Sequence, residues 1–241
     1  MQKPHPLLPA SGMEPTSLSS DPKKWYKQSR WLSAAELLAG ALVVIGHNVY
    51  RLLPNEVPIL FVLGLVSLRW RDGGWGAMGL RRPASWRRIV LIAVAAAALR
   101  ILLGQFLVDP LTARFWPPAA APAGMESIAG DVKTALLWLG IVWTFAAFGE
   151  EIGYRGYLLT RAADLGGRSP MAYWTGVLLV SALFGIGHYY KGPSGIIDSG
   201  VAGMVLGAAY MLSGRNLFAP ILAHGFIDTF GVVALFFGWD T

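Results

Sequence analysis

A short stretch of charged residues interrupts one of the apolar runs of this 241-residue chain. Glu150 and Glu151 are adjacent, and Arg155 follows Glu151 by four positions. An ionisable side chain inside a membrane segment is costly unless it is paired, so these three residues are functional candidates. On a helix, Glu151 and Arg155 share one face, whereas Glu150 points about 100° away. We expect Glu151 and Arg155 to form a supporting ion pair and Glu150 to face a cavity as a base or ligand. The alternative is that both glutamates end a helix among lipid headgroups.

Two later apolar runs carry histidines. Phe184 precedes His188 by four positions, and His224 and Asp228 lie one helical turn apart on one face. At about 1.5 Å per residue, Glu150 and His188 lie roughly 26 and 31 Å from the break near position 167. We therefore expect the four groups at 150, 188, 224 and 228 to converge. Each histidine alone is equally well explained by a hydrogen bond to a neighbouring carbonyl.

The composition is that of a polytopic membrane protein. The chain is 54% hydrophobic and only 14% charged, which is too apolar for a soluble domain of this length. The net charge of +6 comes from basic residues beside apolar runs, where they set orientation and meet anionic lipid. We therefore exclude nucleic acid as a partner. The absence of cysteine excludes disulfides, thiolate metal sites and a cysteine nucleophile.

The apolar runs predict an all-α transmembrane bundle of about seven spans, with the polar site between helices four, five and seven. The predicted spans cover residues 32 to 50, 57 to 70, 89 to 108, 133 to 164, 171 to 190, 196 to 213 and 217 to 238. Residues 1–30 are expected to be a disordered basic tail, and residues 31–241 the membrane domain. The basic flanks predict a cytoplasmic N-terminus and an external C-terminus. Gly200, Gly203 and Gly207 predict close packing of the sixth helix.

Three motifs occur in order on successive predicted helices: Glu150-Glu151-xxx-Arg155, Phe184-xxx-His188 and His224-xxx-Asp228. Together they resemble the signature motifs of the CPBP family of intramembrane proteases, which includes CAAX prenyl endopeptidases and bacteriocin-processing or self-immunity proteins. The resemblance implies peptide-bond hydrolysis, with Glu150 and His188 activating a water and His224 and residue 228 stabilising the oxyanion. Glu151, Arg155 and Phe184 would support them. It also implies a multi-pass protein of a bacterial plasma membrane, with membrane lipids and a peptide or protein substrate as partners.

The last motif has Asp228 where the family often has Asn. An ionised Asp cannot donate a hydrogen bond to an oxyanion, so Asp228 is protonated, orients His224 or binds a cation. Two histidines and two carboxylates are also a credible zinc set. A zinc site formed by Glu150, His188, His224 and Asp228 and a metal-free site both stay open.

Two rival functions remain. A serine intramembrane protease would use Ser194 as nucleophile and His224 as base. A non-enzymatic immunity protein or proton-coupled transporter would use the same polar residues as a scaffold or proton relay. A zinc protease with a His-Glu-xx-His helix is excluded because the chain lacks that motif.

Overall fold

The computed structural model describes residues 25–118 and 124–239. Within these ranges every regular element is a helix, which confirms the all-α prediction. The α-helices are α1 (Trp25–Gln28), α2 (Arg30–Asn48), α3 (Glu56–Arg71), α4 (Trp86–Leu103), α5 (Asp109–Thr112), α6 (Val132–Ile141), α7 (Leu159–Leu165), α8 (Pro170–Ile186), α9 (Gly192–Leu212) and α10 (Phe218–Phe237). Residues 1–24 of the predicted tail lie outside the described residues, and α1 begins inside the range predicted to be disordered.

Five helical segments are long and apolar enough to span a membrane: Arg30–Asn48, Trp86–Thr112, Val132–Leu165, Tyr189–Leu212 and Phe218–Phe237. α8 is a shorter apolar helix, and α3 has 16 residues. These seven elements correspond to the seven predicted spans. The chain is therefore an integral, multi-pass membrane protein.

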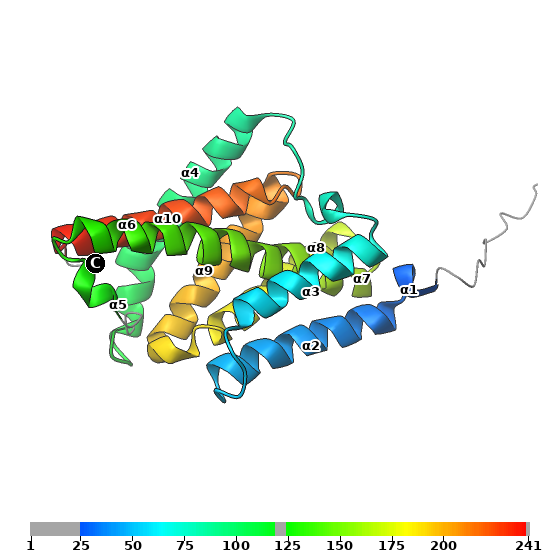
Figure 1. The fold of residues 1–241 in the computed structure, drawn as a ribbon, viewed down its shortest axis with the longest axis horizontal. Helices are drawn as coiled ribbons and strands as arrows, with labels where there is room; N and C mark the ends of the chain where they lie inside the picture. The colour runs from blue at the N-terminus through cyan, green and yellow to red at the C-terminus, as the bar shows by residue number, and fades with distance from the viewer. Residues whose placement is uncertain (1–24, 119–123, 240–241) are drawn as a thin grey trace, which may run out of the picture.

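The segment Val132–Leu165 forms one long helix through the middle of the molecule (Figure 1). Asp131 caps its start by accepting hydrogen bonds from the backbone N–H groups of Lys133 and Thr134. Between α6 and α7 the helix has two π-helical segments, Val142–Glu150 and Ile152–Leu158. Such widened turns frequently occur at functional sites. Here they contain Glu150 and Arg155, and Glu151 lies between them.

The fifth predicted helix ends earlier than expected. α8 stops at Ile186, and a short 3₁₀ turn, Tyr189–Lys191, follows instead of helix to position 190. Gly185 and Gly187 flank this end, and glycine is a poor helix former. His188 consequently lies in the connection after α8 rather than within it.

α8 and α9 pack closely because glycines face the contact. A Cβ at Gly207 would lie 2.6 Å from Val177, and one at Gly185 would lie 2.5 Å from the carbonyl oxygen of Ile196. At Gly203 it would lie 3.0 Å from Ser181. The predicted packing role of Gly203 and Gly207 is confirmed.

An ion network around two buried arginines, Arg71 and Arg161, joins α2, α3 and α7 at the other end of the long helix. Arg161 is its centre: Nη2 lies 2.6 Å from Asp72, Nη1 lies 2.8 Å from Asp164, and Nε lies 2.8 Å from Glu36 without alignment for a hydrogen bond. Arg71 pairs with Glu36 at 2.9 Å, and Arg168 pairs with both aspartates. We call these six residues the Arg161 network.

Candidate active site

Glu151 and Arg155 form the expected ion pair. Their Oε1 and Nη1 atoms are 2.8 Å apart, and both residues are buried. Arg155 also donates from Nη2 to the carbonyl oxygen of Gly203 at 3.2 Å. This bond reaches α9, where the close helix packing brings the Gly203 backbone near. The ion pair of the long helix is thus anchored to a second helix, α9.

Glu151 has a second partner that the sequence did not indicate. Nδ1 of His224, on α10, lies 2.8 Å from the same Oε1 atom. Because a carboxylate only accepts, Nδ1 of His224 carries the hydrogen and donates it to Glu151. Nε2 of His224 then points toward Asp228, whose Oδ2 is 3.6 Å away, beyond hydrogen-bond length. Glu151 therefore sets the orientation of His224.

The ring of Phe184 fills the centre of the cluster. The Arg155 guanidinium lies 4.5 Å from its centroid, and the Tyr154 ring packs edge-on at 5.0 Å. The imidazole rings of His188 and His224 lie 4.7 and 6.1 Å from the same centroid. Phe184 thus contacts the side chains of all three motifs, which explains its place in the pattern.

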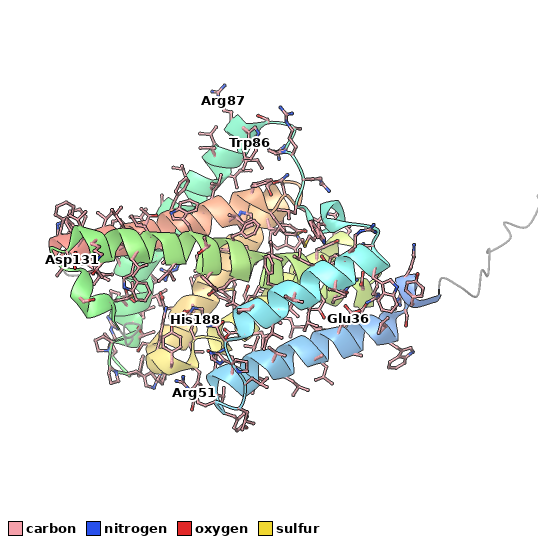
Figure 2. The ribbon with its side chains drawn as sticks, in the orientation of Figure 1. Glu36, Arg51, Trp86, Arg87, Asp131 and His188 are labelled. Atoms are coloured by element: carbon pink, nitrogen blue, oxygen red, sulfur yellow. The ribbon has the colours of Figure 1, made fainter. Side chains whose placement is uncertain are left out.

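His188 is oriented by the backbone. Its Nδ1 lies 2.9 Å from the carbonyl oxygen of Phe184, so Nδ1 donates and Nε2 carries a free lone pair. Figure 2 shows His188 near the middle of the bundle, beyond the end of α8. In this tautomer, His188 can accept a proton or a hydrogen bond through Nε2.

Glu150 ends the first π-helical segment. Its Oε2 atom is buried and has no hydrogen-bond partner among the described residues. Electrostatic interactions link Glu150 to His224 and Asp228, and His188 to His224. An unsatisfied buried carboxylate oxygen is expensive, so it marks either a strained position or a place for a substrate or water.

Two further residues connect the long helix to α10 beside this cluster. Trp143 donates from its indole nitrogen to Thr229 at 3.1 Å. Its ring lies against Gly225, where a Cβ would come within 2.5 Å. Glycine is thus required next to His224, a constraint that no spacing rule could have revealed.

Neither the zinc set nor the serine pair is formed. Among the described residues, no three His, Asp or Glu side chains are grouped so that they could hold a metal ion. The four residues therefore do not fit the suggested zinc site, and we derive no step through a metal. Ser194 donates to the carbonyl oxygen of Pro117 at 2.6 Å, while His224 bonds to Glu151.

The lining of an apolar pocket of about 210 Å³ includes Gly149, the residue before Glu150. It is formed between α3 and the first π-helical segment by Val57, Pro58, Phe61, Thr144, Phe145, Phe148 and Gly149. Phe145 and Phe148 are exposed on the bundle surface. The apolar lining of the pocket therefore suits a hydrocarbon chain.

Residues 132–230 match the family described as type II CAAX prenyl endopeptidase Rce1-like. The matched range contains the long helix and all three motifs. No curated protein and no solved structure matches the chain.

Proposed function

From the family match over residues 132–230, which supports a CAAX-type intramembrane protease, we propose an endopeptidase that hydrolyses a peptide bond of a membrane-associated protein or peptide. The proposal rests mainly on one observation: Glu150, next to the residue that orients His224, keeps a buried oxygen without a hydrogen-bond partner among the described residues. In this proposal Glu150, His188, His224 and Asp228 are the catalytic residues.

Glu150 and His188 would activate the water. Oε2 of Glu150 and Nε2 of His188 are both acceptors, so in the proposed complex a water held between them would donate a hydrogen to each and direct a lone pair at the substrate carbonyl carbon. As the C–O bond forms, Glu150 takes one proton. It returns the proton to the leaving nitrogen when the C–N bond breaks, so water is divided between the new carboxyl and amine.

His224 would stabilise the tetrahedral oxyanion. Since its Nδ1–H is committed to Glu151, Nε2 can donate only when the ring is an imidazolium. The negative charges of Glu151 and Asp228 favour that cation. In this arrangement Asp228 stabilises the charged ring instead of donating to the oxyanion itself.

The apolar pocket supports a lipid-modified or strongly apolar substrate. Gly149 lines the pocket and precedes Glu150, so a hydrocarbon chain held there would lie beside the proposed water. A prenylated C-terminal peptide is the substrate class that the family description suggests. From the resemblance of the three motifs, we also propose that the activity belongs to a bacterial plasma membrane.

A cleavage assay tests this function. The full-length protein in neutral detergent is incubated with a farnesylated peptide that ends three residues after the modified cysteine, and mass spectrometry identifies the products. We expect Glu150→Gln to lower the rate by about 10²- to 10⁴-fold because the base is removed and the shape kept. Asp131→Asn, the same type of change outside the site, should keep activity.

Two outcomes would contradict the proposal. One is undiminished cleavage by Glu150→Gln. The other is no cleavage of either the farnesylated peptide or its unmodified counterpart by a folded protein, which would favour the immunity or transport alternative.

A further inference from the structure

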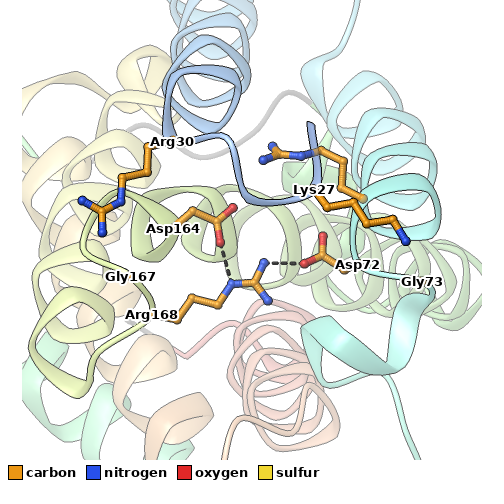
Figure 3. Close-up of a pocket in the computed structure, with 8 residues that line it drawn as sticks. Lys27, Arg30, Asp72, Gly73, Asp164, Gly167 and Arg168 are labelled. Carbon is orange, nitrogen blue, oxygen red and sulfur yellow. Dashed lines mark hydrogen bonds and ion pairs between the residues drawn. The ribbon is translucent and has the colours of Figure 1, made fainter. Parts of the chain in front are cut away.

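A polar cavity of about 610 Å³ lies far from the proposed active site, beside the Arg161 network. It opens where α2 begins and where α3 and α7 end (Figure 3). Its charged lining consists of Lys27, Arg30, Arg71, Asp72, Asp164 and Arg168. Its volume is in the range of small-ligand pockets.

The two carboxylates of the cavity are already neutralised. Asp72 pairs with Arg161 and Arg168, one at each oxygen. Asp164 pairs with the same two arginines and also accepts from the Ser33 hydroxyl at 2.7 Å. The aspartates therefore have little capacity left to hold another cation, and they repel an incoming anion less than bare carboxylates would.

Two basic side chains of the cavity have no hydrogen-bond or ion-pair partner among the described residues. Lys27 and Arg30 are exposed, and no hydrogen bond or ion pair joins either side chain to another described residue. Arg168 is 34% exposed and lies between them in Figure 3, with Arg30 on the Gly167 side and Lys27 on the Gly73 side. Basic groups on opposite sides of one cavity can contact different oxygens of a single anion.

The position of the cavity indicates the depth of its ligand. The spans Arg30–Asn48 and Val132–Leu165 begin and end here, so the cavity lies at the level of the lipid headgroups. The loop between α3 and α4, which we call the basic loop, starts at the same end of the bundle. The distribution of basic residues predicts that this end faces the cytoplasm. The cytoplasmic leaflet carries anionic lipids that basic pockets recognise.

We propose that this cavity binds a phosphate group, supplied by an anionic phospholipid headgroup or by free phosphate, through Lys27, Arg30 and Arg168. The site is separate from the catalytic cluster and does not depend on the proposed peptidase activity.

Thermal unfolding of the full-length protein in neutral detergent tests the proposal. Tm is followed during titration with short-chain phosphatidylglycerol, phosphatidylcholine or inorganic phosphate. We expect a saturable rise with phosphatidylglycerol, and a midpoint about tenfold higher for the double variant Lys27→Gln, Arg30→Gln. These side chains have no described partners, so Tm without lipid should not change.

Two control variants sharpen the test. Arg82→Gln with Arg87→Gln removes two exposed cations from the basic loop and α4; Figure 2 shows Arg87 at the tip of α4, away from Glu36 of the network. This pair should leave the midpoint unchanged. Lys27→Arg with Arg30→Lys keeps both charges and should bind like the wild type.

The lipid and phosphate titrations distinguish the sources. A response to phosphatidylglycerol alone identifies a headgroup, whereas an equal response to inorganic phosphate, lost in the same variant, identifies free phosphate. Equal midpoints in the wild type and the Lys27, Arg30 variant would overturn the proposal. So would an equal loss in the Arg82, Arg87 control or an equal response to phosphatidylcholine.

Discussion

The long helix Val132–Leu165 carries two clusters of buried charge that differ in how fully their carboxylates are paired. In the Arg161 network, both oxygens of Glu36, Asp72 and Asp164 lie against an arginine. In the candidate active site, Oε2 of Glu150 and Oε2 of Glu151 have no hydrogen-bond partner among the described residues. Both clusters would look alike in a count of charged residues.

The difference separates a structural role from a chemical one. A carboxylate with an arginine at each oxygen can hold helices together but is less available to a water or substrate than one with an unpaired oxygen. A carboxylate with an unpaired oxygen costs stability, which a protein tolerates where the free oxygen is needed. The comparison therefore predicts that changes to the two clusters affect different measurements.

Arg161→Gln should produce the largest effect on stability. The change removes a fully buried arginine and leaves three half-buried carboxylates short of a partner, and we expect a loss of about 3–5 kcal/mol. Activity per folded molecule should stay at the wild-type level. Tm measures the loss of stability, and the cleavage rate divided by the folded fraction measures the activity per folded molecule. Arg87→Gln is the control at an exposed arginine. A folded variant with normal Tm and lost activity would break the comparison.

Glu151→Gln should affect both measurements. It weakens the ion pair with Arg155 and the bond that orients His224, so stability should fall by about 1.5–3 kcal/mol. Misplacement of His224 should also slow cleavage, by about 10²-fold. Rate and Tm measured on the same preparation test this. Normal stability with lost activity would instead assign Glu151 a direct chemical role.

Asp228→Asn should have a smaller effect. The change removes a carboxylate 3.6 Å from His224 that favours the charged ring, but the new amide can itself donate to the oxyanion and so offsets that loss. We expect the cleavage rate to be kept or raised. Zinc analysis of both proteins supplies the contrary outcome: zinc bound to the wild type and lost from the variant, with activity restored by added metal, would reinstate the metal site.

Asp131→Ala should have the smallest effect, because the cap lies outside both clusters. Hydrogen bonds from the Thr134 hydroxyl and backbone N–H hold the pKa of Asp131 below its ordinary 3.8. A lowered pKa means that the cap stabilises the fold at neutral pH and loses this contribution as the pH falls through the lowered pKa of the folded protein. The small Tm difference from the wild type should therefore vanish in acid. A difference that persists at low pH would contradict this.

The sequence predicted the helices well because long apolar runs and their basic flanks mark spans directly. It also predicted the ion pair of Glu151 with Arg155, since four-residue spacing on one helix fixes which side chains meet. The hydrogen bond between Glu151 and His224 could not be predicted from the sequence, because it joins residues that are 73 positions apart. The early end of α8 was missed for a related reason: glycines near a helix end give no fixed stopping point.

The unequal lengths of the helices around Glu150 affect the lipid as well as the protein. α3 and α8 have 16 and 17 residues, or about 24 and 26 Å at 1.5 Å per residue, whereas a typical hydrocarbon core is about 30 Å thick. Both pack against the long helix close to the proposed site. This hydrophobic mismatch should thin the bilayer locally. A thinner bilayer shortens the route by which water reaches Glu150, so the short helices would help to hydrate a hydrolytic centre inside the membrane.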